Sequence, residues 1–311
     1  ADSAPSGAPT SPPDPVMAAE GRLVWLVDAG GRAGLWTTDL AGGDPITYMA
    51  GLDEGTTTIR DPLLVGEAVV FIADRPGASE LRVVLPGSPA GLLLDRVVAV
   101  QPDGPDSVIA TRDEGSIRQV VRIRVGGAAP ERLLEVPIPA DAAAAGGPFG
   151  VAISPDGRTV AAGWVGATVT IDGPFPSTLD DVGAPLVVGD DGVLAAVTGR
   201  AGEAYLVVAG QLTELAPPDS DPLTLPGTGF VAWPALHGAD ALDSIEVRDV
   251  LAGLRRTYPV GGSADGIREF TPDHILLEAT AFDPRQRTVG YLDLDDGRFG
   301  TFEAGAPTIQ P

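Results

Sequence analysis

The sequence of 311 residues contains no cysteine, no lysine and no asparagine, so all 20 of its basic residues are arginine. Without cysteine the chain forms no disulfide, no thiolate metal site and no cysteine nucleophile. Without lysine it cannot form a Schiff base or a P-loop, and without asparagine it has no N-glycosylation acceptor. Lysine and asparagine share A/T-rich codons, so we attribute their joint loss to a GC-rich genome, with a halophilic source as the alternative.

Positive charge is scarce as well. The 43 acidic residues outnumber the 20 basic ones and give a formal net charge of −23. Such a surface repels phosphate backbones and anionic lipid headgroups, so we expect no nucleic-acid partner. No apolar run approaches the ~18–20 residues of a membrane-spanning helix, so we expect no transmembrane segment.

The N-terminal segment 1–15 holds only small residues, proline, threonine and aspartate, and no large apolar side chain. This composition predicts a disordered Pro/Ser/Ala-rich tether. Because the chain begins with Ala1, we expect that an upstream segment was removed or omitted. Tethers of this kind follow cleaved signals in exported and lipid-anchored bacterial proteins. We therefore expect an extracytoplasmic location, secreted or anchored to the cell envelope, with a candidate lipid anchor upstream of residue 1.

Beyond the tether, the hydrophobic pattern is that of short strands separated by Gly, Pro and Asp, and only segment 140–145 has helical composition. One strand that runs into a glycine-containing turn recurs seven times. Its copies are 35–40, 81–85, 120–125, 167–171, 205–208, 244–249 and 289–294. The turn glycines are 37 to 46 residues apart, which matches the ~40–50 residue period of propeller blades.

Each of these strands follows a polar turn and a strongly apolar strand. The clear copies are 20–27, 66–72, 103–110, 154–162, 190–197 and 272–277, and a degenerate one lies at 229–233. A strand that is apolar on both faces fits between two neighbouring blades. We therefore predict an all-β fold, a seven-bladed β-propeller of four-stranded antiparallel blades over residues 16–305, with a C-terminal tail at 306–311. Segment 16–19 can supply the inner strand of the first blade. The ring can close by packing or by a borrowed strand.

The run Ile153-Ser-Pro-Asp-Gly-Arg-Thr-Val-Ala resembles the SPDG repeat of TolB-type, WD-repeat-like β-propellers, and segment 20–45 resembles a full repeat. The resemblance covers residues 16–303, loosely in the fifth and sixth blades. It implies a seven-bladed propeller in an exported setting. It implies no catalytic residue, because the repeated Asp and Gly build a turn.

Residues that could carry chemistry are few. We interpret the two histidines, His237 and His274, as turn or surface residues, and Asp293-Leu-Asp-Asp-Gly297 as a hairpin turn rather than a calcium loop. There is no G-x-S-x-G nucleophile elbow. We interpret Trp25, Trp36, Trp164 and Trp233 as blade-packing residues. We accordingly predict no catalytic residue, no cofactor and no metal site.

Charged residues fall into two groups if each blade has strands A to D. The turns between strands A and B carry Glu20, Glu67, Asp103, Asp156, Asp190, Asp191 and Asp273. The loops between strands B and C carry Arg32, Arg75, Arg112, Arg200, Arg285 and Arg287, together with several aspartates. We predict that the arginine-bearing face binds a partner, because the planar guanidinium suits protein contacts. The alternative is that these arginines and aspartates neutralise each other locally.

These expectations favour a non-catalytic extracytoplasmic binding or scaffold propeller that mediates protein–protein interaction, as a candidate subunit of a cell-envelope assembly. Propellers present loops on a rigid disc, and specificity resides in those loops. The alternative is a small-ligand-binding or hydrolytic propeller that uses carboxylates at the channel mouth with a divalent metal. These two functions differ in whether carboxylates and histidines converge at the ring centre.

Overall fold

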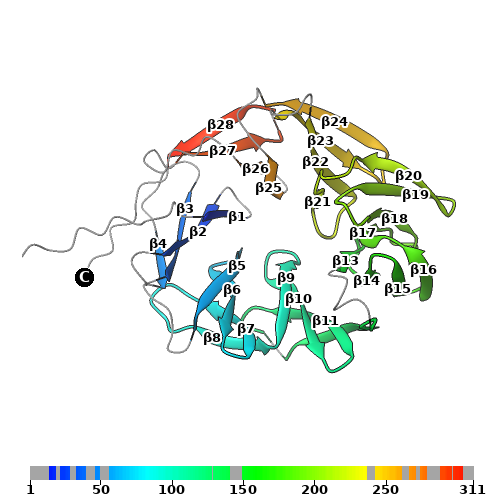
Figure 1. The fold of residues 1–311 in the computed structure, drawn as a ribbon. Helices are drawn as coiled ribbons and strands as arrows, with labels where there is room; N and C mark the ends of the chain where they lie inside the picture. Colours follow the sequence, from blue (N-terminus) through cyan, green and yellow to red (C-terminus); the bar gives the residue numbers. More distant parts are fainter. Residues whose placement is uncertain are drawn as a thin grey trace, which may run out of the picture.

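The computed structural model describes residues 14–18, 22–28, 33–39, 46–49, 56–127, 129–140, 149–236, 242–260, 266–270, 274–278, 288–295 and 297–303. They form seven four-stranded antiparallel sheets, each made of four consecutive strands. Figure 1 shows the sheets arranged as a ring, with the first strand of each sheet nearest the centre. The predicted seven-bladed β-propeller is therefore confirmed.

The strands of the first four blades have the following bounds. Blade 1 contains β1 (Asp14–Ala18), β2 (Arg22–Asp28), β3 (Ala33–Asp39) and β4 (Ile46–Met49). Blade 2 contains β5 (Thr58–Val65), β6 (Ala68–Arg75), β7 (Ala78–Val84) and β8 (Gly91–Asp95). Blade 3 contains β9 (Val97–Pro102), β10 (Ser107–Glu114), β11 (Ile117–Arg124) and β12 (Glu131–Pro137). Blade 4 contains β13 (Phe149–Ile153), β14 (Val160–Trp164), β15 (Ala167–Asp172) and β16 (Ser177–Val182).

The remaining three blades repeat the same order. Blade 5 contains β17 (Ala184–Val188), β18 (Leu194–Thr198), β19 (Ala204–Val208) and β20 (Gln211–Ala216). Blade 6 contains β21 (Leu223–Thr224), β22 (Phe230–Leu236), β23 (Leu242–Asp249) and β24 (Leu254–Pro259). Blade 7 contains β25 (Gly266–Phe270), β26 (His274–Glu278), β27 (Thr288–Asp293) and β28 (Phe299–Glu303).

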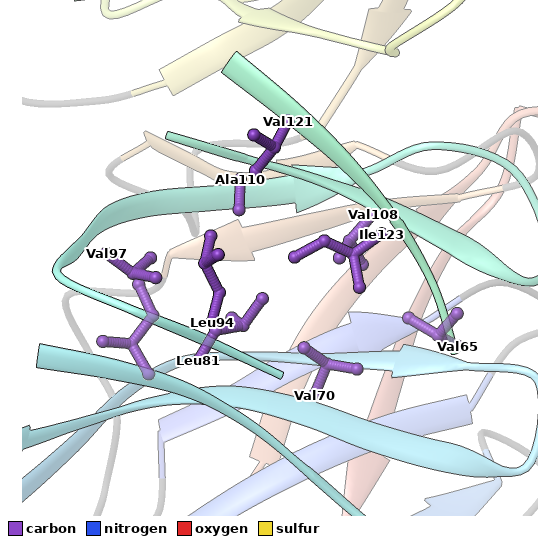
Figure 2. Close-up of a cluster of buried hydrophobic side chains, with 10 residues drawn as sticks. Val65, Val70, Leu81, Leu94, Val97, Val108, Ala110, Val121 and Ile123 are labelled. Atoms are coloured by element: carbon purple, nitrogen blue, oxygen red, sulfur yellow. The ribbon is translucent and has the colours of Figure 1, made fainter. Parts of the chain in front are cut away.

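The second strand of a blade is apolar on both faces because it packs against both neighbouring blades. In β6, Val69 and Phe71 belong to the core shared with blade 1. The alternate residues Val70 and Ile72 belong to the core shared with blade 3. Figure 2 shows this second core, in which Val70 and Leu81 face the side chains of blade 3. The period-two alternation of a strand thus serves two interfaces at once.

Similar cores fill the spaces between successive blades from blade 1 to blade 7. Each fully buried Val, Leu or Ile side chain contributes about 1.5–3 kcal/mol relative to an exposed one. The predicted packing role of tryptophan is confirmed for Trp164 and Trp233, which are buried in two of these cores. Trp25 and Trp36 lie in β2 and β3, and their side chains lie outside the described set.

The first and last blades meet without an exchanged strand among the described residues. Blade 1 is built from β1 to β4 and blade 7 from β25 to β28, so no described strand is exchanged between the two ends of the chain. β1 contacts β25, which brings the first and last blades together. β1 begins at Asp14, two residues before the expected start of the propeller at residue 16. Pro15 is tolerated there because β1 is an edge strand, where a missing N–H breaks no ladder.

The Ser-Pro-Asp-Gly motif forms the turn between β13 and β14. The Ser154 hydroxyl donates to Oδ1 of Asp156 at 2.7 Å, and the Arg158 amide donates to the same oxygen at 3.0 Å. The Gly157 amide donates to the Ser154 carbonyl at 2.9 Å, with Gly157 at φ 71°, where a side chain would be strained. The interpretation of this motif as a structural turn is confirmed.

Among the residues that the structure describes, no helix is long and apolar enough to cross a membrane. Three expectations fall largely or wholly outside the described residues. These are the tether over residues 1–15, of which only residues 14 and 15 are described, the helical composition of 140–145, of which only residue 140 is described, and the C-terminal tail at 306–311.

Candidate functional site

The ring has two faces, which the antiparallel order of the strands defines. With the strands of each blade lettered A to D outward from the centre, the A–B and C–D turns lie on one face, called here the AB face. The B–C turns and the connections between blades lie on the opposite face, called here the BC face. Specificity in propellers resides in such loops, so each face is a candidate interaction surface.

Three of the six predicted partner-binding arginines are described, and all three lie at the BC face. Nε of Arg75 lies 3.2 Å from Oε2 of Glu80. Arg112 donates to Gln119 at 2.8 Å and lies 3.3 Å from Oδ1 of Asp95. Local carboxylate and amide partners thus already engage two of these arginines.

The third described arginine is more exposed. Arg200 lies in the B–C turn of blade 5, and a Cβ built on Gly166 of blade 4 would lie 2.8 Å from its Nη2. Arg200 therefore covers the neighbouring B–C turn. Arg32, Arg285 and Arg287 lie outside the described residues.

The acidic turns lie where the repeat predicted them. The described members of this set occupy A–B turns of blades 2 to 5, and they are Glu67, Asp103, Asp156, Asp190 and Asp191. Glu20 and Asp273 lie outside the described residues. The BC face carries carboxylates too, since Asp113 and Glu114 end β10 there.

Large hydrophobic side chains that are exposed are confined to one face in the described part of the chain. Every large hydrophobic residue that is exposed there lies in an A–B or C–D turn or within two residues of one. The set is Ile46, Leu85, Leu92, Phe175, Val193, Val208, Leu212, Phe230, Leu251 and Leu254. Solvent-exposed apolar side chains that gather on one surface mark candidate binding sites.

Phe175 and Val193 lie on two turns that meet at the boundary between blades 4 and 5. Phe175 is 64% exposed in the C–D turn of blade 4, and Val193 is 56% exposed in the A–B turn of blade 5. A Cβ built on Gly192 would lie 3.4 Å from the Cβ of Phe175, so the two turns touch. We call Phe175, Val193 and the adjacent Asp190 and Asp191 the blade 4/5 patch.

A hydrogen bond also joins the A–B turns of blades 4 and 5 at this boundary. The Asp156 amide of blade 4 donates to Oδ1 of Asp190 in blade 5 at 3.0 Å. Hydrogen bonds from the Ser154 hydroxyl and the Arg158 amide, with the nearby Arg158 charge, hold the pKa of the Asp156 carboxyl below its usual value. The ionised carboxylate is therefore part of the turn structure.

In the described ranges no three His, Asp or Glu residues are grouped so that they could hold a metal ion. His274 was expected in a turn but is the first residue of β26. Its side chain is 18% exposed, lies 4.0 Å from Asp293 and meets the ring of Tyr291 edge-on. Because β26 pairs with β27 at this position, the strand buries most of the ring. His237 lies outside the described residues.

The segment that partly resembles a calcium loop forms the C–D turn of blade 7. The Asp295 amide donates to Oδ1 of Asp293 at 2.8 Å, and the Gly297 amide donates to the Asp293 carbonyl at 3.0 Å. These bonds are those of a hairpin turn stabilised by an aspartate side chain. The sequence interpretation of this segment is confirmed.

A pocket of about 250 Å³ opens between blades 3 and 4, beside the inner strands β9 and β13. Its walls are largely aliphatic and come from Val98, Val100, Ile109 and Val151, with Phe149 on the blade 4 side. Gln101, Thr111 and Arg118 add polar groups from β9, β10 and β11. Its residues lie on four strands of two blades.

Sequence reasoning missed both the blade 4/5 patch and this pocket. A signal for the patch was present, because Phe175 stands between two prolines after Gly173, where a turn and an apolar side chain coincide. No comparable signal exists for the pocket. Its residues lie on separate strands of two blades. In the sequence they cannot be distinguished from other strand residues, because the pocket forms only when the two blades lie side by side.

No protein-family model matches the chain, and no curated protein matches its sequence. Solved structures do resemble it. The β-propeller domain of the Trilobed protease from Pyrococcus furiosus, which has an open velcro topology, is 11% identical with a TM-score of 0.57, over 93% of this chain and 96% of that chain. A prolyl endopeptidase is 12% identical with a TM-score of 0.54, over 94% of this chain and 50% of that chain.

TolB from Acinetobacter baumannii is 12% identical with a TM-score of 0.45, over 93% of this chain and 65% of that chain. The chain thus spans slightly less than two thirds of TolB and half of the prolyl endopeptidase. At such identities structural likeness establishes the fold and leaves activity open. Together with the seven sheets, the two structures with TM-scores above 0.5 identify the chain as a β-propeller.

Proposed function

We propose that the protein is a binding propeller that docks a protein partner on its AB face. One observation carries the proposal, namely that every exposed large hydrophobic side chain in the described part of the chain lies at that face. Exposed apolar side chains rimmed by polar residues are typical of protein interaction sites. The Phe175 ring supplies an aromatic anchor of the kind enriched in the buried centre of interfaces.

The partner is a protein with a basic rim. Asp190 and Asp191 flank the apolar side chains of the blade 4/5 patch, and the whole chain carries a net charge of −23. A cationic partner surface is attracted to this field, whereas an acidic one is repelled. The apolar anchors then supply most of the affinity and the charges supply the rate of association.

The arginines of the BC face are the competing surface. Arg75 and Arg112 already have carboxylate partners, so their recruitment by another protein would require those ion pairs to be exchanged. Arg200 is exposed and is the described arginine best placed to bind a partner. It therefore provides the matched variant on the opposite face.

The finer family assignment and the cellular location belong to the same proposal. The Ser154–Gly157 turn has the residues of the SPDG repeat, which supports a relationship to TolB-type propellers. The composition of segment 1–15 supports an extracytoplasmic setting. Fractionation of the source cells tests the location, and recovery of the chain in the cytoplasmic fraction alone would contradict it.

The experiment compares three full-length proteins as bait in an extract of the source cells. They are the wild type, the double variant Phe175→Ser with Val193→Ser, and Arg200→Ser. Proteins cross-linked to each bait are identified, and the candidate partner is then purified and titrated against all three. Because anchoring residues at an interface contribute about 2 kcal/mol or more, the double variant is expected to bind at least about tenfold more weakly.

Support requires that the purified partner bind the wild type and Arg200→Ser alike, lose affinity for the double variant, and bind more weakly at high salt. Equal binding to the double variant, or a loss confined to Arg200→Ser, contradicts the proposed face. Binding of the wild type to zwitterionic lipid vesicles, lost in the double variant, would show that the apolar side chains serve a membrane instead.

A further inference from the structure

We propose that the pocket between blades 3 and 4 binds a small neutral carbonyl compound, such as an amide with an apolar body. Its volume of about 250 Å³ lies just below the range of about 300–1,000 Å³ for small-molecule sites. The ligand is therefore smaller than a typical cofactor. The site lies near the BC end of both blades and is separate from the AB face.

The largely aliphatic walls of the pocket favour a ligand with an apolar body. Val98 of β9, Ile109 of β10 and Val151 of β13 line the pocket, whereas Val100 of β9 borders it with a side chain that packs into the core between blades 2 and 3. The Phe149 ring packs on Trp164 at 4.4 Å between centroids, so the blade 4 wall is a rigid aromatic surface. Burying an apolar group against such walls is favourable in proportion to the area removed from water.

Three polar side chains line the pocket, those of Gln101, Thr111 and Arg118, and the last two carry the proposed specificity. Thr111 is 5% exposed, and its Oγ1 has no hydrogen-bond partner among the described residues. A buried hydroxyl without a partner costs free energy. Because this Oγ1 has almost no accessible surface, a ligand oxygen or amide recovers that cost only by displacing a neighbouring side chain. Thr111 and Arg118 lie on the same side of blade 3, because Thr111 pairs with Val120 and Arg118 stands two residues before it.

Arg118 is held in place with part of its donor capacity unused. Its Nε and Nη2 donate to the two carboxylate oxygens of Asp113 at 2.7 and 2.9 Å. The guanidinium carbon lies 4.9 Å from the centroid of the Phe149 ring and 5.1 Å from that of Trp164. Within the described ranges Nη1 has no partner, so it can donate to a ligand oxygen.

Charge decides between a carbonyl and a carboxylate. Asp113 already neutralises Arg118 through a bidentate pair, and the chain as a whole carries a net charge of −23. A carboxylate ligand would lose its hydration on entering the pocket, and Arg118 could not compensate for that loss because its charge is already paired with Asp113. A neutral carbonyl accepts from the same donors at a lower desolvation cost, and an amide N–H can in addition donate to the Thr111 hydroxyl.

The test measures binding of three probes of similar shape to the full chain by ligand-observed NMR. The probes are benzamide, benzoate and toluene. We expect benzamide to bind at least about fivefold more tightly than either of the others, since one recovered hydrogen bond is worth about a factor of five. The methyl signals of Val98, Ile109 and Val151 should shift with benzamide.

Matched variants separate a site from nonspecific contact. Thr111→Val should weaken benzamide about fivefold, leave toluene unchanged and raise the melting temperature of the free protein. Thr37→Val removes another buried hydroxyl without a described partner, in blade 1, and should change no affinity. Ala99→Phe fills the pocket from an exposed strand position and should abolish binding of both probes.

Should Thr111→Val fail to fold, Arg118→Met provides the second variant, because it keeps the contact with Phe149 and removes the donors. It should weaken benzamide relative to toluene in the same way. Equal affinities for benzamide and toluene would overturn the carbonyl specificity. Tighter binding of benzoate would overturn the neutral class, and binding that survives Ala99→Phe would overturn the site.

Discussion

The backbone amide of Asp156 donates to the side chain of Asp190 across the boundary between blades 4 and 5, at 3.0 Å. Asp156 belongs to the A–B turn of blade 4, and Asp190 to the A–B turn of blade 5. The bond ties together the two blades that carry Phe175 and Val193. Val193 shares the A–B turn of blade 5 with Asp190, and Phe175 lies in the separate C–D turn of blade 4. The bond therefore restrains the two blades that carry the exposed apolar pair, which limits the entropy lost when a partner binds.

The ionised form of Asp156 stabilises its turn, so its contribution depends on pH. Hydrogen bonds from Ser154 and Arg158 lower the pKa of this carboxyl below the ordinary value of 3.8. The stabilisation is therefore present above about pH 3.8 and is lost as the pH falls through the lower folded-state pKa. We expect the melting temperature of Asp156→Asn to lie below that of the wild type at pH 6, with the gap closing below pH 3.8.

Asp106→Asn is the control for this titration. Asp106 is exposed in the A–B turn of blade 3, and its carboxylate has no hydrogen-bond partner among the described residues. Its variant should follow the wild type at every pH. A gap for Asp156→Asn that is constant from pH 6 to pH 2.5 would show that the negative charge plays no part in the turn.

Glu246 is a carboxylate buried in β23 of blade 6. Its side chain is 8% exposed and accepts hydrogen bonds from Nε of Arg255 at 2.6 Å and from the Thr257 hydroxyl at 2.7 Å. Burial raises the pKa of this group, but the two hydrogen bonds outweigh burial, so the pKa lies below the ordinary 4.5. Glu246→Ala should lower the free energy of unfolding at pH 7 by about 2 kcal/mol.

The same group has a predictable pH dependence. Because its folded pKa is lowered, its stabilisation is complete above pH 4.5 and declines as the pH falls below it. Urea unfolding at pH 7 and at pH 3.5 should therefore show a smaller difference between wild type and Glu246→Ala at the lower pH. Glu67→Ala, at an exposed turn position, should stay within about 0.5 kcal/mol of the wild type at pH 7.

Gly150 sets the spacing between the inner strands of blades 4 and 5. A Cβ at this position would overlap the carbonyl oxygen of Pro185 and lie 3.1 Å from the Cβ of Ala184. Gly150→Ala should therefore push β13 away from β17 and cost about 1–3 kcal/mol of stability. Denaturant unfolding measures this cost.

Gly91→Ala is the matched substitution. A Cβ at Gly91 in β8 would lie 3.7 Å from the nearest atom, which is ordinary contact. This variant should be neutral or slightly stabilising, since alanine restricts the unfolded chain more than glycine does. Equal effects of the two substitutions would contradict the close approach of blades 4 and 5.

Substitution of Leu81 tests how much the hydrophobic cores between blades contribute to stability. The Leu81 side chain is fully buried against blade 3, whereas Leu92 in the same blade is 58% exposed. Leu81→Ala should lower the free energy of unfolding by about 2–5 kcal/mol, because it removes buried surface and leaves a cavity. Leu92→Ala should change it by no more than about 0.5 kcal/mol. A loss of similar size in both variants would show that the core lies elsewhere.

The sequence was sufficient to predict the blades because each one repeats the same two signals. The apolar second strand and the glycine turn after the third strand mark their positions even in blade 6, where segment 229–233 is degenerate but β22 still forms. The start of the first blade was placed two residues late. Asp14 and Pro15 have the composition of a tether, and only their pairing with Leu26 and Trp25 makes them a strand.

The candidate surfaces were less accessible to sequence reasoning. Arg75 and Arg112 were expected to face a partner. Whether an arginine side chain is available to a partner depends on the carboxylates beside it, and these are Glu80 in the neighbouring strand for Arg75 and Asp95 in the neighbouring blade for Arg112. Phe175 and Val193 belong to different blades, and nothing in the sequence places them side by side. Contacts between blades follow from the ring geometry, which a repeat period defines only coarsely.

The docking face itself is tested most directly by hydrogen–deuterium exchange of the full chain, free and in complex with its purified protein partner. The account predicts slower exchange on binding in the C–D turn of blade 4 at 173–176 and the A–B turn of blade 5 at 189–193, with no change in the B–C turn at 199–203. Protection of 199–203 with unaltered exchange at 173–176 and 189–193 would place the partner on the BC face and contradict the account.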